Sequence, residues 1–376
     1  MRILVAPDKF RGTLTAAQAA EAVAVGWTRT RPDDVVSRVP MADGGEGTLD
    51  ALVAALKGET DSASVTGPLG DPVTADFGVV GTPEGSMVVI EMARASGLGL
   101  VNERRRDALR ASTFGTGELM RIAIERTDPT SMLVCIGGSA TTDGGAGMAQ
   151  ALGARLLDAQ GESIGPGGEG LLSLSRIDLA ELPARCGDIR FNVASDVDNP
   201  LTGPMGAAAV YGPQKGASSA DIVLLDRALG HFAAVFSRDL GTDLKERPGA
   251  GAAGGLGAGL MGFLGARLRP GVEVVMDAVG LRQRLEEADL VITGEGRLDA
   301  SSLHGKTVEG VLNAAADAQV PGIVVCGRAD VHPPGARVAT LVDRFGLQRA
   351  LEDTRPALEE LAADLAQDPL GTAPNS

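Results

Sequence analysis

The sequence predicts an α/β protein of two domains, one of them built from both ends of the chain. Its 376 residues are long enough for two domains, and 44% hydrophobic against 22% charged residues is typical of a globular protein. Apolar, strand-like runs alternate with helical patterns in the first sixty residues and again from about residue 272. The stretch between them has a different texture, which indicates an inserted domain.

The N-terminal part goes through strand, loop and helix twice. Residues 2–6 are an apolar run, and Thr15 with Gln18 makes a capping-box pattern before a helix with apolar residues at helical spacing. A second short strand is expected at 35–39, followed by a loop and a helix that runs to Lys57. This order predicts a parallel sheet, in which ligands bind beyond the carboxyl ends of the strands.

The middle of the chain predicts antiparallel hairpins followed by further βα units. The expected strands are 62–66, 73–80, 87–91, 132–136 and 189–194, and the expected helices are 114–126 and 218–240. A hairpin is expected around Gln160-Gly161, whereas residues 165–188 look irregular.

The C-terminal part returns to the first pattern. Strands are expected at 288–293, 322–327 and 338–342, and helices over 346–367, followed by a loose tail. We therefore expect one domain at 1–65 and 287–376, with a mixed α/β domain inserted at 66–286.

Composition and charge exclude several classes of function. A formal net charge of -15 argues against sequence-independent binding to nucleic acid, which needs clustered lysines and arginines. The three cysteines, Cys135, Cys186 and Cys326, are far apart and sit in apolar surroundings, which favours reduced thiols in a cytoplasmic protein. No secretion signal or membrane-spanning run is recognisable, so no membrane partner is expected.

The most distinctive segment is 136–147, where an apolar strand runs into Gly137-Gly138-Ser139-Ala140-Thr141-Thr142-Asp143-Gly144-Gly145. Bare backbone amides and hydroxyls before a helix favour binding of an anion. The alternative is a glycine-rich turn in which Asp143 caps the helix. The same Asp-Gly-Gly pattern starts at Asp43, and again either a binding loop or a helix cap would explain it.

A third polar loop follows the strand expected at 189–194. It contains Ser195, Asp196, Asp198 and Asn199, a set of oxygens that suits Mg²⁺. The alternative is a cluster of Asx turns before a proline.

Lysine is rare in this chain and concentrated in such loops. Of five lysines against 29 arginines, Lys9, Lys215 and Lys306 lie in loops punctuated by glycine or proline. A compact ammonium suits a phosphate oxygen better than the forked guanidinium does.

Other catalytic classes have weaker support. The histidines His231, His304 and His332 form no triad or zinc pattern that can be defended. Residues 257–262 match the dinucleotide-binding glycine pattern, but no strand precedes them, so close helix packing is the better interpretation. Residues 304–307 resemble half a phosphate-binding loop, but Ala300 occupies the position of its first glycine. Glycine loops, lysines and carboxylates together indicate phosphoryl transfer.

Taken together, these motifs resemble the bacterial type I glycerate kinase family. The matching segments are 6–10, 40–48, 136–147, 195–201, 212–217 and 292–299, and they occur in the family's order over nearly the whole chain. Arg11 and Thr13 stand where the family usually has Lys and Ser, and Thr142 where it often has Asn.

The resemblance implies ATP-dependent, Mg²⁺-requiring phosphorylation of D-glycerate to 2-phosphoglycerate or 3-phosphoglycerate. It also implies two α/β domains, one of them Rossmann- or flavodoxin-like with a parallel sheet, and an active site in the cleft between them. The expected protein is cytoplasmic and a monomer or homodimer.

Within this framework we assign roles to individual residues as hypotheses. The expected catalytic residues are Asp196, Lys9 and Asp8; the phosphate- or nucleotide-binding residues are Gly137, Gly138, Ser139, Thr141, Lys215 and Lys306; the substrate-binding residues are Asp43, Gly44, Gly45, Arg11 and Glu295; and the Mg²⁺ ligands are Asp196, Asp198 and Asn199. Two alternatives remain: a non-catalytic regulator that binds a sugar acid or nucleotide on the same scaffold, and, less favoured, a dinucleotide-dependent oxidoreductase.

Overall fold

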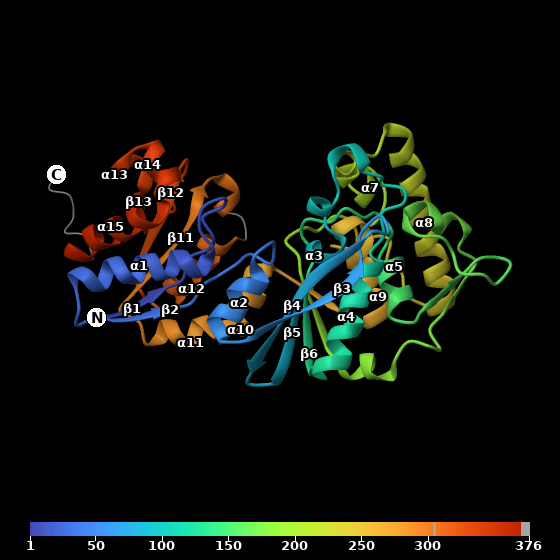
Figure 1. Cartoon of the computed structure of the whole chain (residues 1–376), viewed down its shortest axis with the longest axis horizontal. Coiled ribbons are helices and arrows are strands. Elements are labelled where there is room, and N and C mark those ends of the chain that lie inside the picture. Colours follow the sequence, from blue (N-terminus) through green and yellow to red (C-terminus); the bar gives the residue numbers. More distant parts are fainter. Residues whose placement is uncertain (304–305, 370–376) are drawn as a thin grey trace. The chain divides into compact units, whose positions relative to one another are not determined.

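The computed structural model describes residues 1–303 and 306–369 and divides the chain into two compact units (Figure 1). The first unit comprises Met1–Asp43, Asp50–Gly58 and the described chain from Pro270 onward. The second comprises Gly44–Leu49 and Glu59–Arg269. The expected helix start at 304–305 and the expected tail at 370–376 lie outside the described residues.

The first unit has a parallel sheet built from both chain ends. Its strand order is β13-β12-β11-β1-β2, and every neighbouring pair is parallel. The strands are β1 (Arg2–Val5), β2 (Val35–Arg38), β11 (Leu290–Leu298), β12 (Gly322–Ala329) and β13 (Arg337–Thr340). β1 (blue in Figure 1) therefore lies directly beside β11 (orange), although almost 300 residues separate them.

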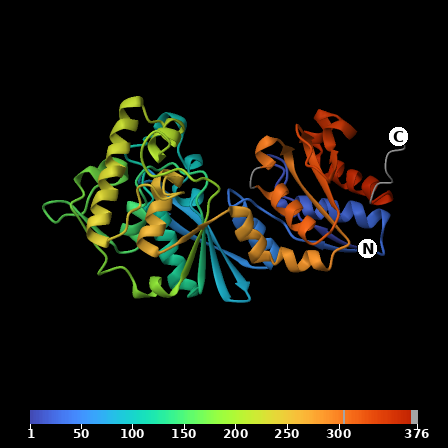
Figure 2. The same ribbon diagram turned by 180° about the vertical axis from the view of Figure 1, so that it is seen from behind.

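Helices cover both faces of this sheet. Along β12, successive buried side chains point alternately to one face and to the other. Ile323 and Val325 of β12 pack towards α1 (Ala16–Thr30) and α15 (Thr354–Gln367), whereas Val324 and Cys326 pack with α12 (Thr307–Asp317). The second layer also holds α10 (Gly271–Val279) and α11 (Leu281–Glu286), whose orange ribbons can be followed in Figure 2. Buried alternation of this kind is expected of a strand covered on both faces.

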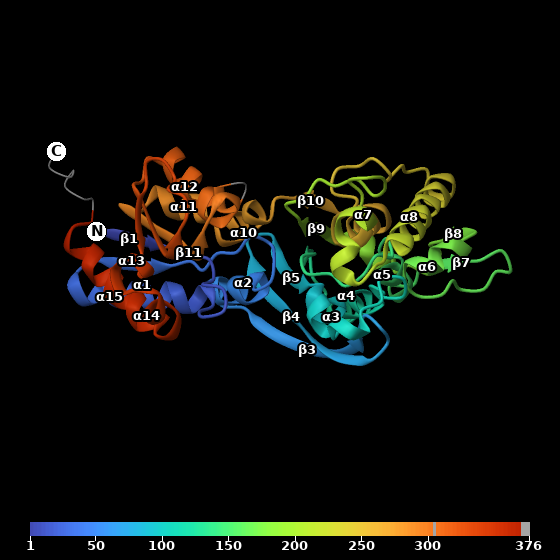
Figure 3. The ribbon, with the colours of Figure 1, turned by 90° about the horizontal axis from the view of Figure 1, so that it is seen from above.

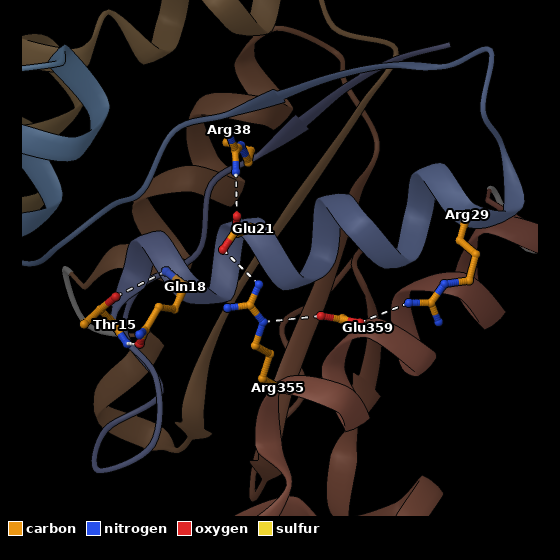
Figure 4. A network of polar contacts seen from close by, with 7 residues as sticks. All are labelled: Thr15, Gln18, Glu21, Arg29, Arg38, Arg355 and Glu359. Carbon is orange, nitrogen blue, oxygen red and sulfur yellow. Dashed lines mark hydrogen bonds and ion pairs between the residues drawn. The ribbon is translucent and has the colours of Figure 1, made fainter.

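Helices α1 and α15 join the two ends of the chain closely. The predicted capping box of Thr15 and Gln18 starts α1 (Figure 4). Gly26 lies against the α15 backbone, since a Cβ there would come within 2.0 Å of the Glu359 carbonyl oxygen. Arg355 bridges to Glu21 at 3.0 Å across the same contact, and Arg29 bonds Glu359. Fully buried Trp27 completes the contact from α1.

The order of the strands places a switch point between β1 and β11. From β1 the chain passes through α1 to β2 on one side, and from β11 it passes through α12 to β12 on the other. Ligands of open α/β sheets bind beyond the carboxyl ends of the strands at such a point. Asp8 and Glu295 lie here.

The second unit contains a mixed sheet in the order β10-β9-β6-β5-β4-β3. β3 (Glu59–Thr66), β4 (Pro72–Thr82) and β5 (Gly85–Glu91) pair antiparallel, as predicted for the hairpins. β5, β6 (Ser131–Cys135), β9 (Arg190–Ala194) and β10 (Arg267–Arg269) pair parallel. The predicted α/β class, with one parallel and one mixed sheet, is confirmed.

The core of the second unit lies between this sheet and several helices. Buried Ile90, Met132 and Val134 of the sheet pack with residues of α4 (Phe114–Thr127), α5 (Ala146–Ala151), α8 (Ser219–Leu240) and α9 (Leu256–Leu264). Phe232, Phe236 and Phe263 pack ring against ring, with centroids 5.0 to 6.2 Å apart. With Phe77 and Phe191, the core thus holds five of the chain's few aromatic residues.

The interpretation of residues 165–188 as irregular was wrong. This stretch contains α6 (Gly167–Gly170), β8 (Arg176–Asp178) and two short 3₁₀ turns, η3 (Leu171–Ser173) and η4 (Ala184–Asp188). β7 (Arg155–Leu157) pairs antiparallel with β8, and on the side of the expected hairpin it has a bridge from Leu157 to Ser163 and a hydrogen bond from the Ile164 N–H to the Leu156 carbonyl. The β8 backbone is held by α8, because the Ile177 N–H donates to the Asp239 carboxylate at 2.8 Å. Figure 3 shows the ribbon of β8 next to that of α8. Tertiary packing rather than local pattern therefore orders this stretch.

The domain boundaries differ from the expected ones at 65/66 and 286/287. β3 belongs to the mixed sheet, so the main segment of the second unit begins at Glu59, and α10 and α11 belong to the first unit. The remaining elements are α2 (Thr48–Leu56), α3 (Ala93–Ser96), α7 (Ala207–Tyr211), α13 (Leu341–Phe345), α14 (Leu347–Glu352), η1 (Leu98–Leu100), η2 (Glu103–Arg105), η5 (Pro213–Lys215), η6 (Ala252–Gly255) and η7 (Ala300–Leu303). Within the described part of the chain, no helix has the length and apolar character that crossing a bilayer requires.

Candidate active site

The loop after β1 presents Asp8 at the switch point of the parallel sheet. The Asp8 N–H donates to the Gly294 carbonyl, so the pairing of β1 with β11 continues to this residue. Phe10 is buried and exchanges backbone hydrogen bonds with Leu14, which closes the loop behind it. The Asp8 carboxylate accepts a hydrogen bond from Thr307 Oγ1 at 2.6 Å and one from the Lys9 N–H at 2.6 Å. Its position is therefore fixed from both ends of the chain.

Glu295 lies on β11 near Asp8. Its Oε1 atom is buried and has no hydrogen-bond partner among the residues that the structure describes. Burial raises the pKa of Glu295 to about 7, and the negative charge of Asp8 adds to this effect. A hydrogen bond from Ser302 and the charge of Lys306 act in the opposite direction.

The pKa of Asp8 is also raised above its ordinary value. Burial and, to a lesser extent, the charge of Asp43 raise its pKa to about 6, against the opposing effect of the hydrogen bonds from Thr307 and Lys9. The pKa values of Asp8 and Glu295 therefore both lie near neutral pH, which is the range in which a general base or acid is effective.

Six of the expected site residues thus lie in the described part of the first unit. Asp8, Lys9, Asp43, Glu295 and Lys306 interact electrostatically, and the Arg11 backbone packs against Gly296. Sequence reasoning missed Thr307 and Ser302, which hold the two carboxylates. The signal for Thr307 was its place directly after Lys306 at a helix start.

In the second unit, the loop after β6 is exposed only at its tip. Gly137 and Gly138 are exposed, Ser139 is 7% exposed, and Thr141 and Thr142 are completely buried. The Ala140 N–H donates to the Ser96 carbonyl, and the Gly138 carbonyl accepts from Leu98. The tip therefore presents the backbone of Gly137 and Gly138, whereas Ser139 is nearly buried and the hydroxyl of Thr141 is completely buried.

Asp143 at the end of this loop is saturated with hydrogen bonds. Its carboxylate accepts from the N–H and the hydroxyl of Thr113, each at 2.8 Å, and from the N–H groups of Gly145 and Gly147. Burial raises the pKa of Asp143, and these donors oppose the shift. Asp143 therefore caps the start of α5, the structural alternative from the sequence. The signal for Thr113, which sequence reasoning did not connect with Asp143, was its place at the start of α4.

The buried side chain of Lys215, in η5, contacts the same loop. It is 1% exposed, and its Nζ donates to the Thr141 carbonyl oxygen at 2.5 Å. The second Asp-Gly-Gly loop also belongs here, because a Cβ on Gly137 would lie 3.5 Å from Gly45 Cα. Gly44 and Gly45 thus share the second unit with the loop that they resemble.

The loop after β9 carries the expected Mg²⁺ ligands. Asp196 and Asp198 are exposed, whereas the Asn199 amide donates to the Met205 carbonyl and accepts from the Tyr211 hydroxyl. Over the described ranges, no three His, Cys, Asp or Glu side chains form a group that could hold a metal ion by themselves. Mg²⁺ commonly binds one or two carboxylates together with nucleotide phosphates and water, and the two exposed carboxylates fit that role.

The fold and these groups are typical of an α/β enzyme for phosphoryl transfer. Such an enzyme has backbone-lined loops, lysines and carboxylates at the ends of its strands. The chain matches the model of the glycerate kinase family over residues 3–369. It is 47% identical over 371 residues to a glycerate kinase of Halalkalibacterium halodurans, covering 97% of each chain. It is 49% identical over 327 residues to a glycerate 2-kinase of Escherichia coli, covering 87% of this chain and 85% of that one.

A solved structure agrees with this match. A crystal structure from Salmonella typhimurium LT2, provisionally assigned as glycerate kinase 2, superposes with a TM-score of 0.90 at 44% identity, covering 98% of this chain and 97% of the other. The chain belongs to the glycerate kinase family. Membership makes it a kinase and implies ATP as the phosphoryl donor.

Proposed function

We propose that this protein transfers the γ-phosphoryl group of ATP to a hydroxyl of D-glycerate, giving 2-phosphoglycerate or 3-phosphoglycerate and ADP. The observation that carries the proposal is the 45 to 49% identity to three glycerate kinases over most of the chain. The proposal includes the bacterial type I branch of the family, a Mg²⁺ requirement, a cytoplasmic location and a monomer or homodimer.

In this proposal Asp8 is the general base. The ionised carboxylate accepts the proton of the attacking hydroxyl, whose oxygen bonds to the γ-phosphorus as the bond to the leaving ADP oxygen breaks. A pKa of about 6 leaves Asp8 mostly ionised at neutral pH and basic enough to accept a proton. Thr307 fixes the orientation of the carboxylate.

The cations and the remaining carboxyl group bind the substrates. Lys9 and Lys306 neutralise the carboxylate of glycerate or a transferred phosphoryl oxygen, since a lysine acts as a compact charge. Glu295, with a pKa of about 7, donates a hydrogen bond to a substrate oxygen in its protonated form. Arg11 and Asp43 complete the set expected around glycerate.

The tip of the loop after β6 binds phosphate in this proposal. Gly137 and Gly138 approach a phosphate without side chains, and Ser139 adds a hydroxyl. The further expectation that one substrate meets residues of both units stays a prediction. It is tested by the coupling of Asp8→Asn with Ser139→Ala in a double-mutant cycle.

Asp196 and Asp198 would hold Mg²⁺, which neutralises charge on the phosphates when bound. Asp196, the first candidate for the base or a Mg²⁺ ligand from the sequence, is the alternative base in this proposal. Asp196→Asn should cost orders of magnitude in turnover while leaving the fold intact. Near-normal turnover of this variant would remove Asp196 from the chemistry.

A coupled ADP-release assay with D-glycerate and other hydroxy acids tests the function. A kinase of this kind releases ADP with D-glycerate, and phosphorus NMR of the product identifies the phosphorylated hydroxyl. Tight ligand binding without ADP release would indicate the regulator instead. Reduction of a nicotinamide cofactor would indicate an oxidoreductase.

A further inference from the structure

Lys215 was expected to contact phosphate, but its surroundings point to a different task. It is one of the largest side chains that are completely buried, and it lies at the end of η5. The next residue, Gly216, has φ +91°, and a Cβ there would come within 2.9 Å of Arg106 Cβ. The chain therefore turns tightly and packs closely directly after Lys215, and the Lys215 side chain is only 1% exposed.

The ammonium holds a backbone carbonyl of the phosphate-binding loop. Lys215 Nζ donates to the Thr141 carbonyl oxygen at 2.5 Å. On the other side of the same carbonyl, a Cβ on Gly254 would lie 1.9 Å from the Thr141 oxygen. The Gly254 carbonyl also accepts from the Gly144 N–H at 3.0 Å. Thr141 is thus fixed between η5 and the glycine-rich segment around η6.

The threonine hydroxyls of the loop do not stabilise this conformation. The hydroxyls of Thr141 and Thr142 are buried, and the described residues offer neither of them a hydrogen-bond partner. Each unsatisfied buried polar group costs about 1–3 kcal/mol. The conformation must therefore be maintained by groups outside the two threonines.

Asp143 supplies the opposite charge for Lys215. Its negative charge raises the pKa of Lys215, whereas burial lowers that pKa to about 7. Asp143 is itself fixed by Thr113 and by the N–H groups that begin α5. Lys215 and Asp143 thus hold two neighbouring points of the loop, a carbonyl and a helix start.

We propose that Lys215 is a positioning residue that locks the Thr141 carbonyl, so that Gly137, Gly138 and Ser139 are presented to the phosphates of the nucleotide. This inference rests on the proposed function, because it names the task of the loop in that reaction. Lys215 does not touch the nucleotide itself. Its loss loosens the loop and weakens ATP binding, while glycerate binding is unaffected.

The test compares Lys215→Met, which keeps the length of the side chain, with Lys215→Gln, which keeps a hydrogen-bond donor. Lys245→Met is the matched control, because Lys245 is exposed. The readouts are amide hydrogen exchange of residues 137–147 in the free protein, the KM for ATP and the KM for D-glycerate. We expect at least tenfold faster exchange in this loop and at least a tenfold higher KM for ATP in Lys215→Met. Exchange in β4 and β5 should be unchanged, and Lys215→Gln should restore part of the protection.

Unchanged loop exchange in Lys215→Met would overturn the proposal, whether ATP binding is lost, as for a direct phosphate ligand, or kept. Faster loop exchange with a normal KM for ATP would overturn it as well, because Lys215 would then be only structural. If Lys215→Met does not fold, acetylation of the wild-type protein decides: Lys215 should react far more slowly than Lys245, and equal rates would contradict the burial that the proposal needs. Absence of ADP release by the wild type would refute the proposed function alone, since exchange is measured without turnover.

Discussion

The two Asp-Gly-Gly loops have the same sequence pattern but place their aspartates in opposite surroundings. Asp143 is completely buried and receives hydrogen bonds from Thr113, Gly145 and Gly147. Asp43 is only half-buried, and its charge acts on Asp8, whose pKa it helps to raise. The pattern alone therefore does not decide the role. The elements packed around each loop do.

The same contrast separates the carboxylates of the two units. In the second unit Asp143 is used to build a loop, and Lys215 reinforces it. In the first unit, hydrogen bonds to Asp8 and Glu295 offset the effect of burial only in part, so the pKa values of both are raised to near neutral pH. Groups with displaced pKa values in such a position are good candidates for acid–base chemistry.

The largest expected effect on stability is that of Asp143→Ala. The change leaves the N–H and the hydroxyl of Thr113 buried without their acceptor, and each such unsatisfied group costs about 1–3 kcal/mol. The free energy of unfolding, measured with urea, should fall by about this amount. A loss below about 1 kcal/mol would show that Asp143 does not hold the loop.

Much of the fold could be predicted, because the deciding signals are local. The capping box of Thr15 and Gln18 and the apolar runs of β1, β6 and β12 are visible in the sequence and occur where predicted. The register of β8 was not predictable, because it depends on β7 and on Asp239 of the distant helix α8. The domain boundaries differ from the expected ones for the same reason, because they depend on contacts between distant parts of the chain.

The sequence proposes residues for the candidate site, but it does not reveal the contacts of those residues. Asp8, Lys9 and Glu295 follow from the positions of strand ends. That Thr307 would bond Asp8 could not be inferred, because 299 residues separate them in the chain. Similarly, no local pattern showed that Lys215 would be buried against Thr141.

The next largest effect concerns the pH dependence of stability. Asp8 and Glu295 have raised pKa values in the folded protein, so folding binds protons between the ordinary carboxyl pKa of about 4 and about 7. Their contribution to stability is complete below this window and is lost as the pH rises through it. Asp8→Asn and Glu295→Gln should each flatten the fall in thermal stability between about pH 4.5 and pH 7.5.

Asp61→Asn serves as the control, because the pKa of this exposed residue is lowered by a hydrogen bond from Arg126 rather than raised. It should leave that part of the stability profile unchanged. A slope that survives in both site variants would mean that other groups cause it.

The smallest expected effect is that of Asp43→Asn on the activity profile. Removing the charge of Asp43 favours ionisation of Asp8, so the pKa of Asp8 falls and the acidic limb of kcat/KM moves to lower pH. The free energy of unfolding should change far less than in Asp143→Ala. A limb that stays in place, or moves to higher pH, would break the proposed link between Asp43 and Asp8.

The most direct test of the account is ADP release with D-glycerate and Mg²⁺-ATP by the wild type and by Asp8→Asn, both measured at pH 8. The account predicts phosphoglycerate formation by the wild type and a loss of roughly 100-fold to 10,000-fold in kcat for the variant, with its fold and ATP binding retained. Turnover of the variant within a few-fold of the wild type would contradict the assignment of Asp8 as the base.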